Sequence, residues 1–298
     1  MQKQYAGAAA YAGLGVTTRS EKDASGVSWI FLDDIYPQSP AEGAGLKRFD
    51  KIVEVDGRPF QNVPLADVPH FLRGPAGSTV SLVIQRRNER LTVSVVRAPI
   101  QAGVRAQIVR PRVAYLKIYN FSKGTGEQVR QALRSLGAAG PLRGLIVDLR
   151  GNSGGSYSEV TSVAGVFLPR QTVIGLAIHN AGTSPLVSSG DPLFPSLPMA
   201  ALSDGATASA PEILLVGLRA AHRATIVGEK TAGVGGGGVN VPLPAGGLHV
   251  TVEMVVSPRS EPIQGAGVAP DLGVALTAVD VERAVDTQLE AALSAVLK

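Results

Sequence analysis

Apolar and polar residues alternate through much of the chain up to Pro99, which is the pattern of half-buried β-strands. The pattern predicts four strands, at residues 28–32, 51–55, 80–84 and 91–95. Asp56-Gly57 follows the second strand and is a hairpin-turn signal. Short helices are expected at residues 39–46, with Pro40 in the first turn, and at residues 64–72. A mainly β domain is therefore expected at the start of the chain.

From residue 113 onward the pattern changes to strands that alternate with helices, after a predicted connector at residues 101–112. Strands are expected at residues 113–118, 145–149 and 197–202, and helices at residues 126–136, 158–167 and from Ser209 through Leu218. The fully apolar run Leu145-Ile146-Val147 is typical of a strand inside an α/β layer. This order predicts an α/β core with a central sheet. A last amphipathic helix is expected from the N-cap Asp280 to Val296.

Composition excludes several classes of site. The chain has no cysteine, which rules out thiol nucleophiles, disulfides and zinc–thiolate sites. The net charge of +4 is small for 298 residues. Its densest basic cluster, Arg86, Arg87 and Arg90, falls at a predicted hairpin tip, whereas a nucleic-acid site needs a broader basic stripe with aromatic residues. No apolar run approaches the roughly 20 residues that span a bilayer, and no metal-ligand cluster is visible.

Four runs in the first region resemble the motifs of PDZ domains, in the same order. They are Gly13-Leu14-Gly15-Val16, Ser39-Pro40-Ala41-Glu42-Gly43-Ala44-Gly45-Leu46, Asp50-Lys51-Ile52-Val53-Glu54-Val55-Asp56-Gly57 and Arg73-Gly74-Pro75-Ala76-Gly77-Ser78. A single G-L-G is weak evidence, because glycine more often only serves a turn. The four runs together imply a mainly β PDZ-like domain at residues 13–99. Its loop Gly13, Leu14, Gly15 and Val16 would offer backbone N–H groups to the carboxylate of a peptide that adds to a sheet edge.

Four later runs resemble the core of the C-terminal processing (tail-specific) serine peptidases. They are Asp148-Leu149-Arg150-Gly151-Asn152-Ser153-Gly154-Gly155, Thr207-Ala208-Ser209-Ala210-Pro211-Glu212-Ile213, Arg223-Ala224-Thr225-Ile226-Val227-Gly228-Glu229-Lys230-Thr231, and Pro262-Ile263-Gln264-Gly265 with Pro270-Asp271. The resemblance covers nearly the whole chain from Gly13. It implies a peptidase core with a C-terminal helix at residues 100–298, and a remnant of the N-terminal arm at residues 1–12.

The resemblance implies that Ser209 is the nucleophile, at a corner before a helix. The first N–H groups of a helix have no partner within it and carry partial positive charge. The amide of Ala210 can therefore face a developing oxyanion, with Gly154 in the Gly-rich turn as the second donor. Taken alone, Ser209 is more simply interpreted as an N-cap serine, and only the surrounding motifs favour a catalytic role.

The general base of the family is not matched. Val234 occupies the position of the family's lysine, and Gly238 that of the glutamine that supports it. Three interpretations stay open: Lys230 reaches Ser209 from the neighbouring turn, His179 acts from a loop-like stretch, or the peptidase is degenerate. Loss of a general base slows a reaction by about 10²–10⁴-fold.

The run 233–238 fits G-x-G-x-x-G formally, but an extended segment follows it, so a flexible loop is expected rather than a dinucleotide site.

The resemblance implies a serine endopeptidase that processes protein substrates, with a PDZ domain that binds apolar C-terminal tails, and no cofactor. The alternatives are a weak or inactive pseudopeptidase that captures tails without cutting them, and a scaffold that regulates another protease. A periplasmic or other extracytoplasmic location in a bacterium is expected, with any signal peptide absent from this chain. The sequence leaves a homo-oligomer open.

Overall fold

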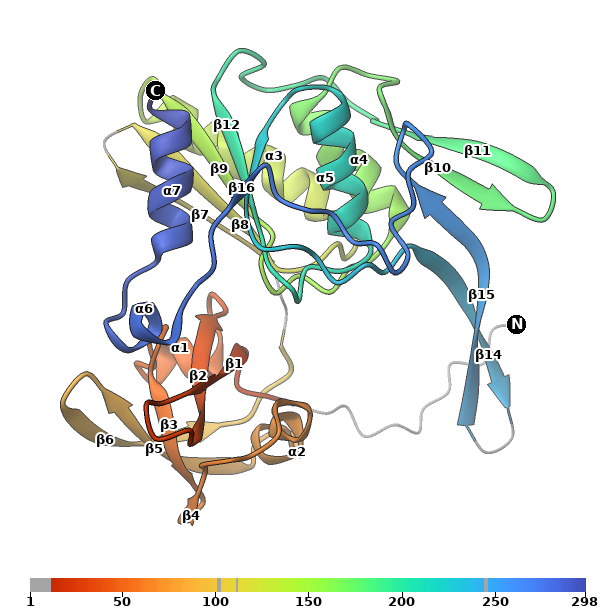
Figure 1. Cartoon of the computed structure of the whole chain (residues 1–298). Coiled ribbons are helices and arrows are strands. Elements are labelled where there is room, and N and C mark those ends of the chain that lie inside the picture. The colour runs from red at the N-terminus through yellow and green to blue at the C-terminus, as the bar shows by residue number, and fades with distance from the viewer. Residues whose placement is uncertain (1–11, 101–102, 111, 244–245) are drawn as a thin grey trace. The chain divides into compact units, whose positions relative to one another are not determined.

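The computed structural model describes residues 12–100, 103–110, 112–243 and 246–298, and the chain divides into two compact units (Figure 1). The first unit comprises Met1–Ala102 and Leu276–Asp286, and the second comprises Gly103–Ala275 and Thr287–Lys298. The predicted core range, 100–298, thus includes a segment that packs with the first unit. Except for Ala12, the predicted arm at residues 1–12 lies outside the described residues.

The first unit is built on an antiparallel sheet of order β1-β2-β3-β5-β6, with β4 paired to β3. Its strands are β1 (Val16–Lys22), β2 (Ser28–Ile35), β3 (Lys51–Val55), β4 (Arg58–Pro59), β5 (Thr79–Arg86) and β6 (Glu89–Val96). All four predicted strands are present. The helices are α1 (Pro40–Gly43), the 3₁₀ helix η1 (Leu65–Asp67) and α2 (Val68–Leu72). The first is shorter than predicted, because Gly45 adopts a positive φ of 75°.

A segment from near the C-terminus completes the first unit. It contains α6 (Ala278–Glu282), and its buried Leu276 and Val281 pack with Phe31. The prediction of a single C-terminal helix is therefore wrong, because α6 ends before Ala284, whose φ is 54°, and a separate α7 (Thr287–Val296) follows. Thr277, not Asp280, is the N-cap of α6.

The second unit contains a six-stranded sheet of order β16-β13-β12-β9-β8-β7. The strands are β7 (Val104–Arg110), β8 (Val113–Ile118), β9 (Gly144–Asp148), β12 (Met199–Ser203), β13 (Thr225–Gly228) and β16 (Leu272–Gly273). All neighbours from β8 to β16 are parallel, and only β7 is antiparallel. The strand β7 replaces most of the predicted connector, because its alternating residues form a half-exposed edge strand. The predicted α/β fold class is confirmed.

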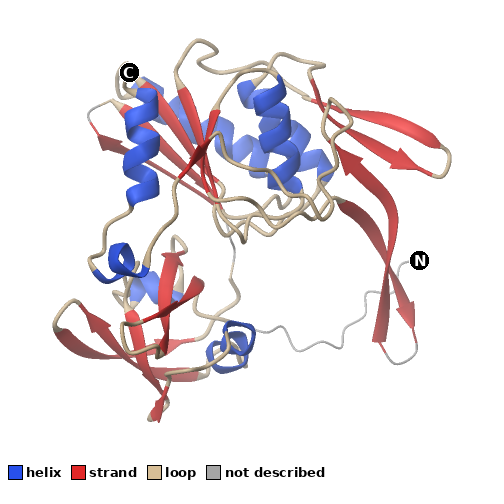
Figure 2. Cartoon of the chain, viewed as in Figure 1, coloured by secondary structure: helices blue, strands red, loops and turns tan. Residues whose placement is uncertain are grey.

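Helices cover both faces of this sheet (Figure 2). One face packs against α3 (Thr125–Ala138), α4 (Tyr157–Phe167) and α5 (Ala210–Ala220) through a large apolar core. The opposite face packs against α7, where Ala292, Leu293 and Val296 meet Val113 and Ile146. Because the parallel strands end at one edge, the loops after β9, β12 and β13 gather there.

A four-stranded antiparallel sheet of order β11-β10-β15-β14 completes the second unit. Its strands are β10 (Val173–His179), β11 (Gly182–Val187), β14 (Gly236–Leu243) and β15 (Gly246–Val256). The sequence predicted only an extended stretch near β14. His179 is the last residue of β10 and does not lie in a loop, and Gly236, Gly237 and Gly238 belong to β14.

Candidate active site

Ser209 stands at the corner between β12 and α5 in a strained conformation. Its φ is 68° and its ψ is −120°, which is unfavourable for a residue with a side chain. Such strain costs about 1–3 kcal/mol and persists only where the surroundings enforce it. The preceding amide, that of Ala208, donates to the carbonyl oxygen of Asn152 at 2.9 Å, and the Ser209 amide donates to Glu212 Oε2 at 2.7 Å. Both flanks of the corner are thereby fixed.

The Gly-rich turn after β9 lies directly against Ser209, as the motifs predicted. A Cβ atom added to Gly154 would lie 2.9 Å from Ser209 Cβ and 3.2 Å from Ser209 Oγ. Gly154 also has a φ of 121°. This position therefore requires glycine twice over, for its backbone conformation and for the close approach of the serine.

The amide expected to be the second oxyanion donor is already hydrogen-bonded. The Gly154 N–H donates to Oδ1 of Asn152 at 2.9 Å, and the fully buried Asn152 side chain in turn donates to the Ile118 carbonyl. Within the described part of the chain, the amides of Ala210 and Gly155 have no acceptor. The first amide of α5 is thus available to an oxyanion, and Gly155 has a free N–H group in the same turn as Gly154.

The fully buried carboxylate of Glu212 organises the corner. Its Oε2 accepts the amides of Ser209 and Val234, at 2.7 and 2.8 Å. Its Oε1 accepts the Gly233 amide at 2.8 Å and the Thr231 hydroxyl. The first turn of α5 further stabilises this negative charge. Sequence reasoning included Glu212 only as part of a motif, although Ser-x-x-Glu before an apolar helix is a capping-box signal.

Position 234 therefore lies beside Ser209, but it carries no base. Val234 is 40% exposed, and Gly238 lies within β14 opposite Thr251. The predicted flexible loop is instead a hydrogen-bonded turn that leads into β14. The amides of Gly233 and Val234 donate to Glu212, and the next amide, that of Gly235, donates to Gln264 Oε1 at 2.9 Å.

The contacts described for the two proposed substitute bases are with residues other than Ser209. The side chain of Lys230 packs near Gly267 in the segment after β15, since a Cβ added to Gly267 would lie 3.4 Å from Lys230 Cε. His179 Nδ1 lies 3.2 Å from Glu253 Oε2, in the four-stranded sheet. Among the residues with described positions, no lysine or histidine side chain is hydrogen-bonded to Ser209.

A buried ionic cluster anchors the end of β9 below the Gly-rich turn. The Asp148 carboxylate is fully buried and accepts from Lys117 Nζ at 3.1 Å, from Tyr115 at 2.6 Å and from the guanidinium of Arg150. Burial by itself raises the pKa of Asp148, but the charges of Arg150 and Lys117 outweigh it and hold the pKa far below its usual range. The turn that follows thus starts from a rigid point.

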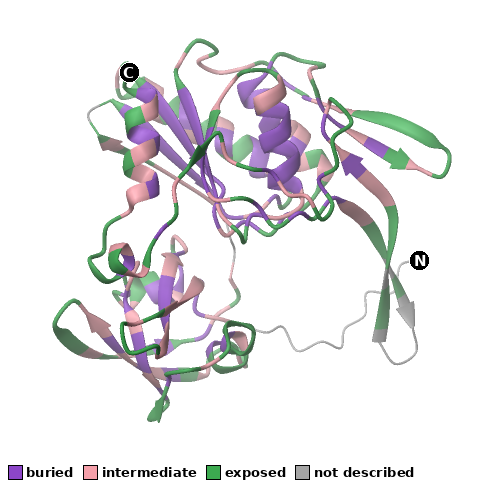
Figure 3. Ribbon diagram, viewed as in Figure 1, coloured by how far each residue is buried: buried purple, intermediate pink, exposed green. Residues whose placement is uncertain are grey.

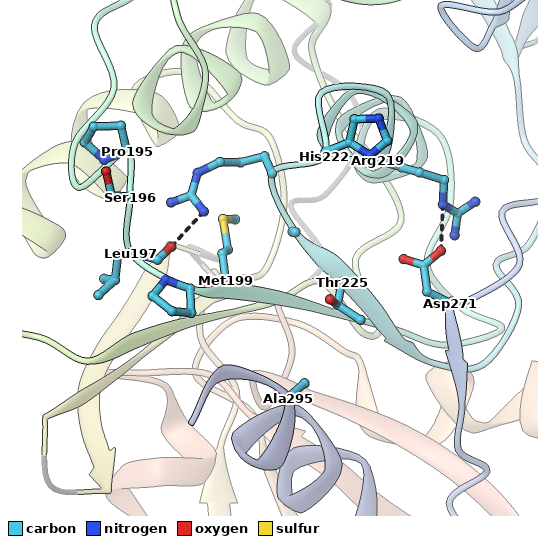
Figure 4. Close-up of a pocket in the computed structure, with 12 residues that line it drawn as sticks. Pro195, Ser196, Leu197, Met199, Arg219, His222, Thr225, Asp271 and Ala295 are labelled. Atoms are coloured by element: carbon cyan, nitrogen blue, oxygen red, sulfur yellow. Dashed lines mark hydrogen bonds and ion pairs between the residues drawn. The ribbon is translucent and has the colours of Figure 1, made fainter. Parts of the chain in front are cut away.

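A cavity of about 590 Å³ opens at the other end of the sheet (Figure 4). It is lined by Met199 and Thr225, the first residues of β12 and β13, whereas Ser209 follows the carboxyl end of β12. Arg219 pairs with Asp271 at its rim, with 3.0 Å between Nε and Oδ1. This cavity is therefore separate from the serine corner.

In the first unit, the predicted carboxylate loop precedes β1. The Gly13 amide is hydrogen-bonded to the Ala98 carbonyl at 3.0 Å, so it is not free. Gly15 has a φ of 78°, and a Cβ there would lie 2.3 Å from Ser39 Cβ. Over the described residues, the amides of Leu14 and Gly15 have no acceptor, and Val16 is the first residue of β1.

Two family models match the chain. That of peptidase family S41 matches residues 112–274, and that of the PDZ domain matches residues 9–85. The chain is 32% identical over 266 residues to a carboxyl-terminal-processing protease of Synechocystis sp., which covers 86% of this chain and 62% of that protein. The chain thus spans about three fifths of the length of this curated relative.

Solved structures of similar proteases have the same fold. A photosystem II D1 C-terminal processing protease superposes with a TM-score of 0.61 at 26% identity, over 98% of this chain and 78% of the other. A putative S41 protease from Bacteroides fragilis gives a TM-score of 0.72 over 97% and 86%, and at 19% identity it supports the fold alone. The resemblance predicted from the motifs is confirmed, and the chain belongs to peptidase family S41 and carries a PDZ domain.

Proposed function

We propose that this chain is a serine endopeptidase that processes protein substrates. The observation that carries the proposal is the strained Ser209, packed against Gly154 at the start of α5, with the Ala210 amide unengaged. The curated relatives named carboxyl-terminal-processing proteases support the same activity.

In this reaction Ser209 Oγ adds to the carbonyl carbon of the scissile peptide bond and loses its proton. The Ala210 amide and an amide of the Gly154–Gly155 turn stabilise the oxyanion. Gly155 can donate directly, whereas Gly154 must first release Asn152. The C–N bond then breaks, the amine leaves with a proton, and water hydrolyses the serine ester. Without a side-chain base, the proton passes to solvent, and the reaction is slower by about 10²–10⁴-fold.

One observation favours a second function. Because Val234 and Gly238 leave Ser209 without a base, the chain is also suited to capture tails without cutting them, alone or as a scaffold for another protease. Cleavage of casein separates the two functions. The peptidase cuts casein slowly, and Ser209→Ala loses the activity. A wild-type rate equal to that of Ser209→Ala would leave only the binding function.

The PDZ-like unit would supply the recognition of substrates, with the amides of Leu14 and Gly15 as donors to the C-terminal carboxylate of an apolar tail.

We propose a periplasmic or other extracytoplasmic location, which is supported by the bacterial processing proteases among the relatives. No helix in the described residues combines the length and apolarity needed to cross a membrane. Cell fractionation tests the location.

A further inference from the structure

The outer part of the β14–β15 hairpin carries a row of exposed apolar side chains. Val239, Val241, Leu248 and Val250 are 50%, 40%, 52% and 37% exposed. Val239 pairs with Val250 and Val241 with Leu248, so the four side chains share one face of the ribbon. Figure 3 shows the exposed stretch. A two-stranded ribbon with an uncovered apolar face is marginal in water, which indicates a partner for this face.

The strand register places this row on the face of the ribbon that meets Tyr157. The ladder between β14 and β15 has a bulge between Gly237 and Gly238, whose extra residue, Val252, lies in β15. Gly237, Val239 and Val241 therefore keep their alternation along β14 and point to the same face. On that face, a Cβ added to Gly237 would lie 2.4 Å from the Tyr157 hydroxyl. Tyr157 is the first residue of α4, directly after the turn of Gly154. The apolar row therefore shares the face of β14 that contacts Tyr157, which follows the Gly-rich turn in sequence.

The strand β14 is also an edge strand, because it ends the order of its sheet. Glycines in an edge strand leave the backbone open to the close approach of another chain. The run Gly236–Gly238 begins two residues after Val234, whose amide shares a Glu212 oxygen with the Ser209 amide. A polypeptide strand added along β14 would therefore lead to the serine corner.

We propose that β14 is the strand on which the substrate polypeptide is held. An extended segment of the substrate pairs with the free edge of β14, and its alternate apolar side chains pack beside Val239 and Val241, which extends the apolar face that Leu248 and Val250 form on β15. The row contains no charged residue, and the neighbouring Glu253 is engaged with His179, so the segment is apolar. This assignment rests on the proposed peptidase function and adds the class of sequence that the site accepts.

Binding to the full-length Ser209→Ala chain tests the proposal without catalysis. The probe is a fluorescent peptide of alternating Val and Ser, acetylated at the N-terminus and amidated at the C-terminus. It has no carboxylate for the loop of the first unit. The double variant Val239→Asp/Val241→Asp should raise the Kd at least about tenfold, because a charge replaces each apolar contact. The matched control is Ile178→Asp, on the other face of the same sheet and 44% exposed, which should leave the Kd unchanged.

Changes to the probe keep the test independent of protein folding. Two further peptides carry N-methyl groups on the odd-numbered or on the even-numbered amides. Only one of these two peptides should lose binding, because strand pairing needs the N–H groups on one side of the peptide. The proposal would be overturned by equal affinity for the methylated and unmethylated peptides or by no binding of the unmethylated peptide. It would also be overturned if Ile178→Asp weakened binding as much as the double variant. A change in sedimentation of the peptide-free Asp variants would identify a second copy of the chain as the occupant, and would also overturn it.

Casein cleavage separates this inference from the proposed function. If wild type cuts casein but the β14 variants bind the peptide as tightly as the parent chain, the assignment of β14 is wrong and the peptidase function stands. If the peptide binds on β14 but wild type does not cut, the peptidase function fails and the surface is a binding site only.

Discussion

The backbone amides of Ser209 and Val234 donate to the same oxygen of the buried Glu212, at 2.7 and 2.8 Å. Ser209, the proposed nucleophile, and the position of the family's lysine are therefore held together by one carboxylate. The backbone for a general base is in place, and what is missing is the side chain.

Restoring the base should raise peptidase activity. We expect Val234→Lys with Gly238→Gln to increase casein cleavage at least about tenfold, which is part of the roughly 10²–10⁴-fold that general-base catalysis contributes. A lysine base must be neutral, which partial burial favours by lowering its pKa, and an amide at position 238 can orient it without adding charge. Val234→Lys alone should gain less. Ser209→Ala in the double variant is the control.

If wild type already cuts well and the double variant cuts no better, another group is the base. Loss of cleavage in Lys230→Ala or in His179→Ala would then identify it. If neither wild type nor the double variant cuts, the defect extends beyond the base.

Glu212→Gln should disturb the corner although it changes few atoms. The carboxylate accepts two hydrogen bonds on each oxygen, whereas an amide group would face two of those donors with its own N–H groups. We expect a loss of about 2–5 kcal/mol in the free energy of unfolding, measured in urea. The control is Glu290→Gln, whose side chain is 55% exposed and which should change stability by less than about 1 kcal/mol. Equal stability of the two variants would contradict the role of Glu212.

Gly154→Ala should abolish the reaction of Ser209 with active-site reagents, because the added methyl carbon would lie 2.9 Å from Ser209 Cβ. Gly140→Ala is the matched control. It also has a strongly positive φ, 148°, but a Cβ there meets nothing within 4 Å. The control should lose only about 1–2 kcal/mol of stability from backbone strain, and its labelling rate should not change. Full labelling of Gly154→Ala would refute the packing of the turn against the serine.

The PDZ-like unit should bind peptides through a free C-terminal carboxylate. Amidation of the peptide should weaken binding about tenfold or more, since hydrogen bonds to a charged acceptor are lost. Gly15→Ala should weaken it as well, because the new Cβ would lie 2.3 Å from Ser39 Cβ, whereas Gly26→Ala has open space at a similar φ of 83°. Titration by fluorescence anisotropy measures both. Equal affinity for free and amidated peptides would exclude carboxylate capture.

Stability should fall in acid because of Asp148. Its folded-state pKa is depressed below the unfolded value of about 4, so the unfolded chain takes up the proton first as the pH falls. This contribution is complete above about pH 5 and falls progressively as the pH drops from the unfolded pKa towards the much lower folded one. Urea unfolding from pH 6 to pH 3 should show the first part of this loss. Asp148→Asn should be less stable at pH 6 by about 3–5 kcal/mol, because the buried charges of Lys117 and Arg150 lose the carboxylate of Asp148. A stability that does not change with pH in this range would argue against the cluster.

The parts of the site that depend on short runs of sequence were predictable. Asp148 to Gly155 and Thr207 to Ile213 each form one local turn at a strand end, so their motifs predicted the meeting of Ser209 and Gly154. The hub at Glu212 was not predicted, because its bonds to Thr231, Gly233 and Val234 arise only when β12 and β13 lie side by side.

The missed elements have similar causes. The glycines of β14 have low intrinsic strand propensity, and only pairing with β15 makes them a strand. The helix α6 ends at Glu282, before Ala284 with its positive φ, and its Val281 packs with Phe31, which lies far away in sequence. Long-range contacts therefore decided where local patterns were ambiguous.

Labelling of the native full chain with a fluorophosphonate, followed by mapping of the modified residue by mass spectrometry, tests whether Ser209 is a nucleophile. We expect a single label on Ser209, which disappears in Ser209→Ala and after denaturation. A native chain that stays unlabelled beside a serine hydrolase that reacts in the same tube, or a label on another serine, would contradict it.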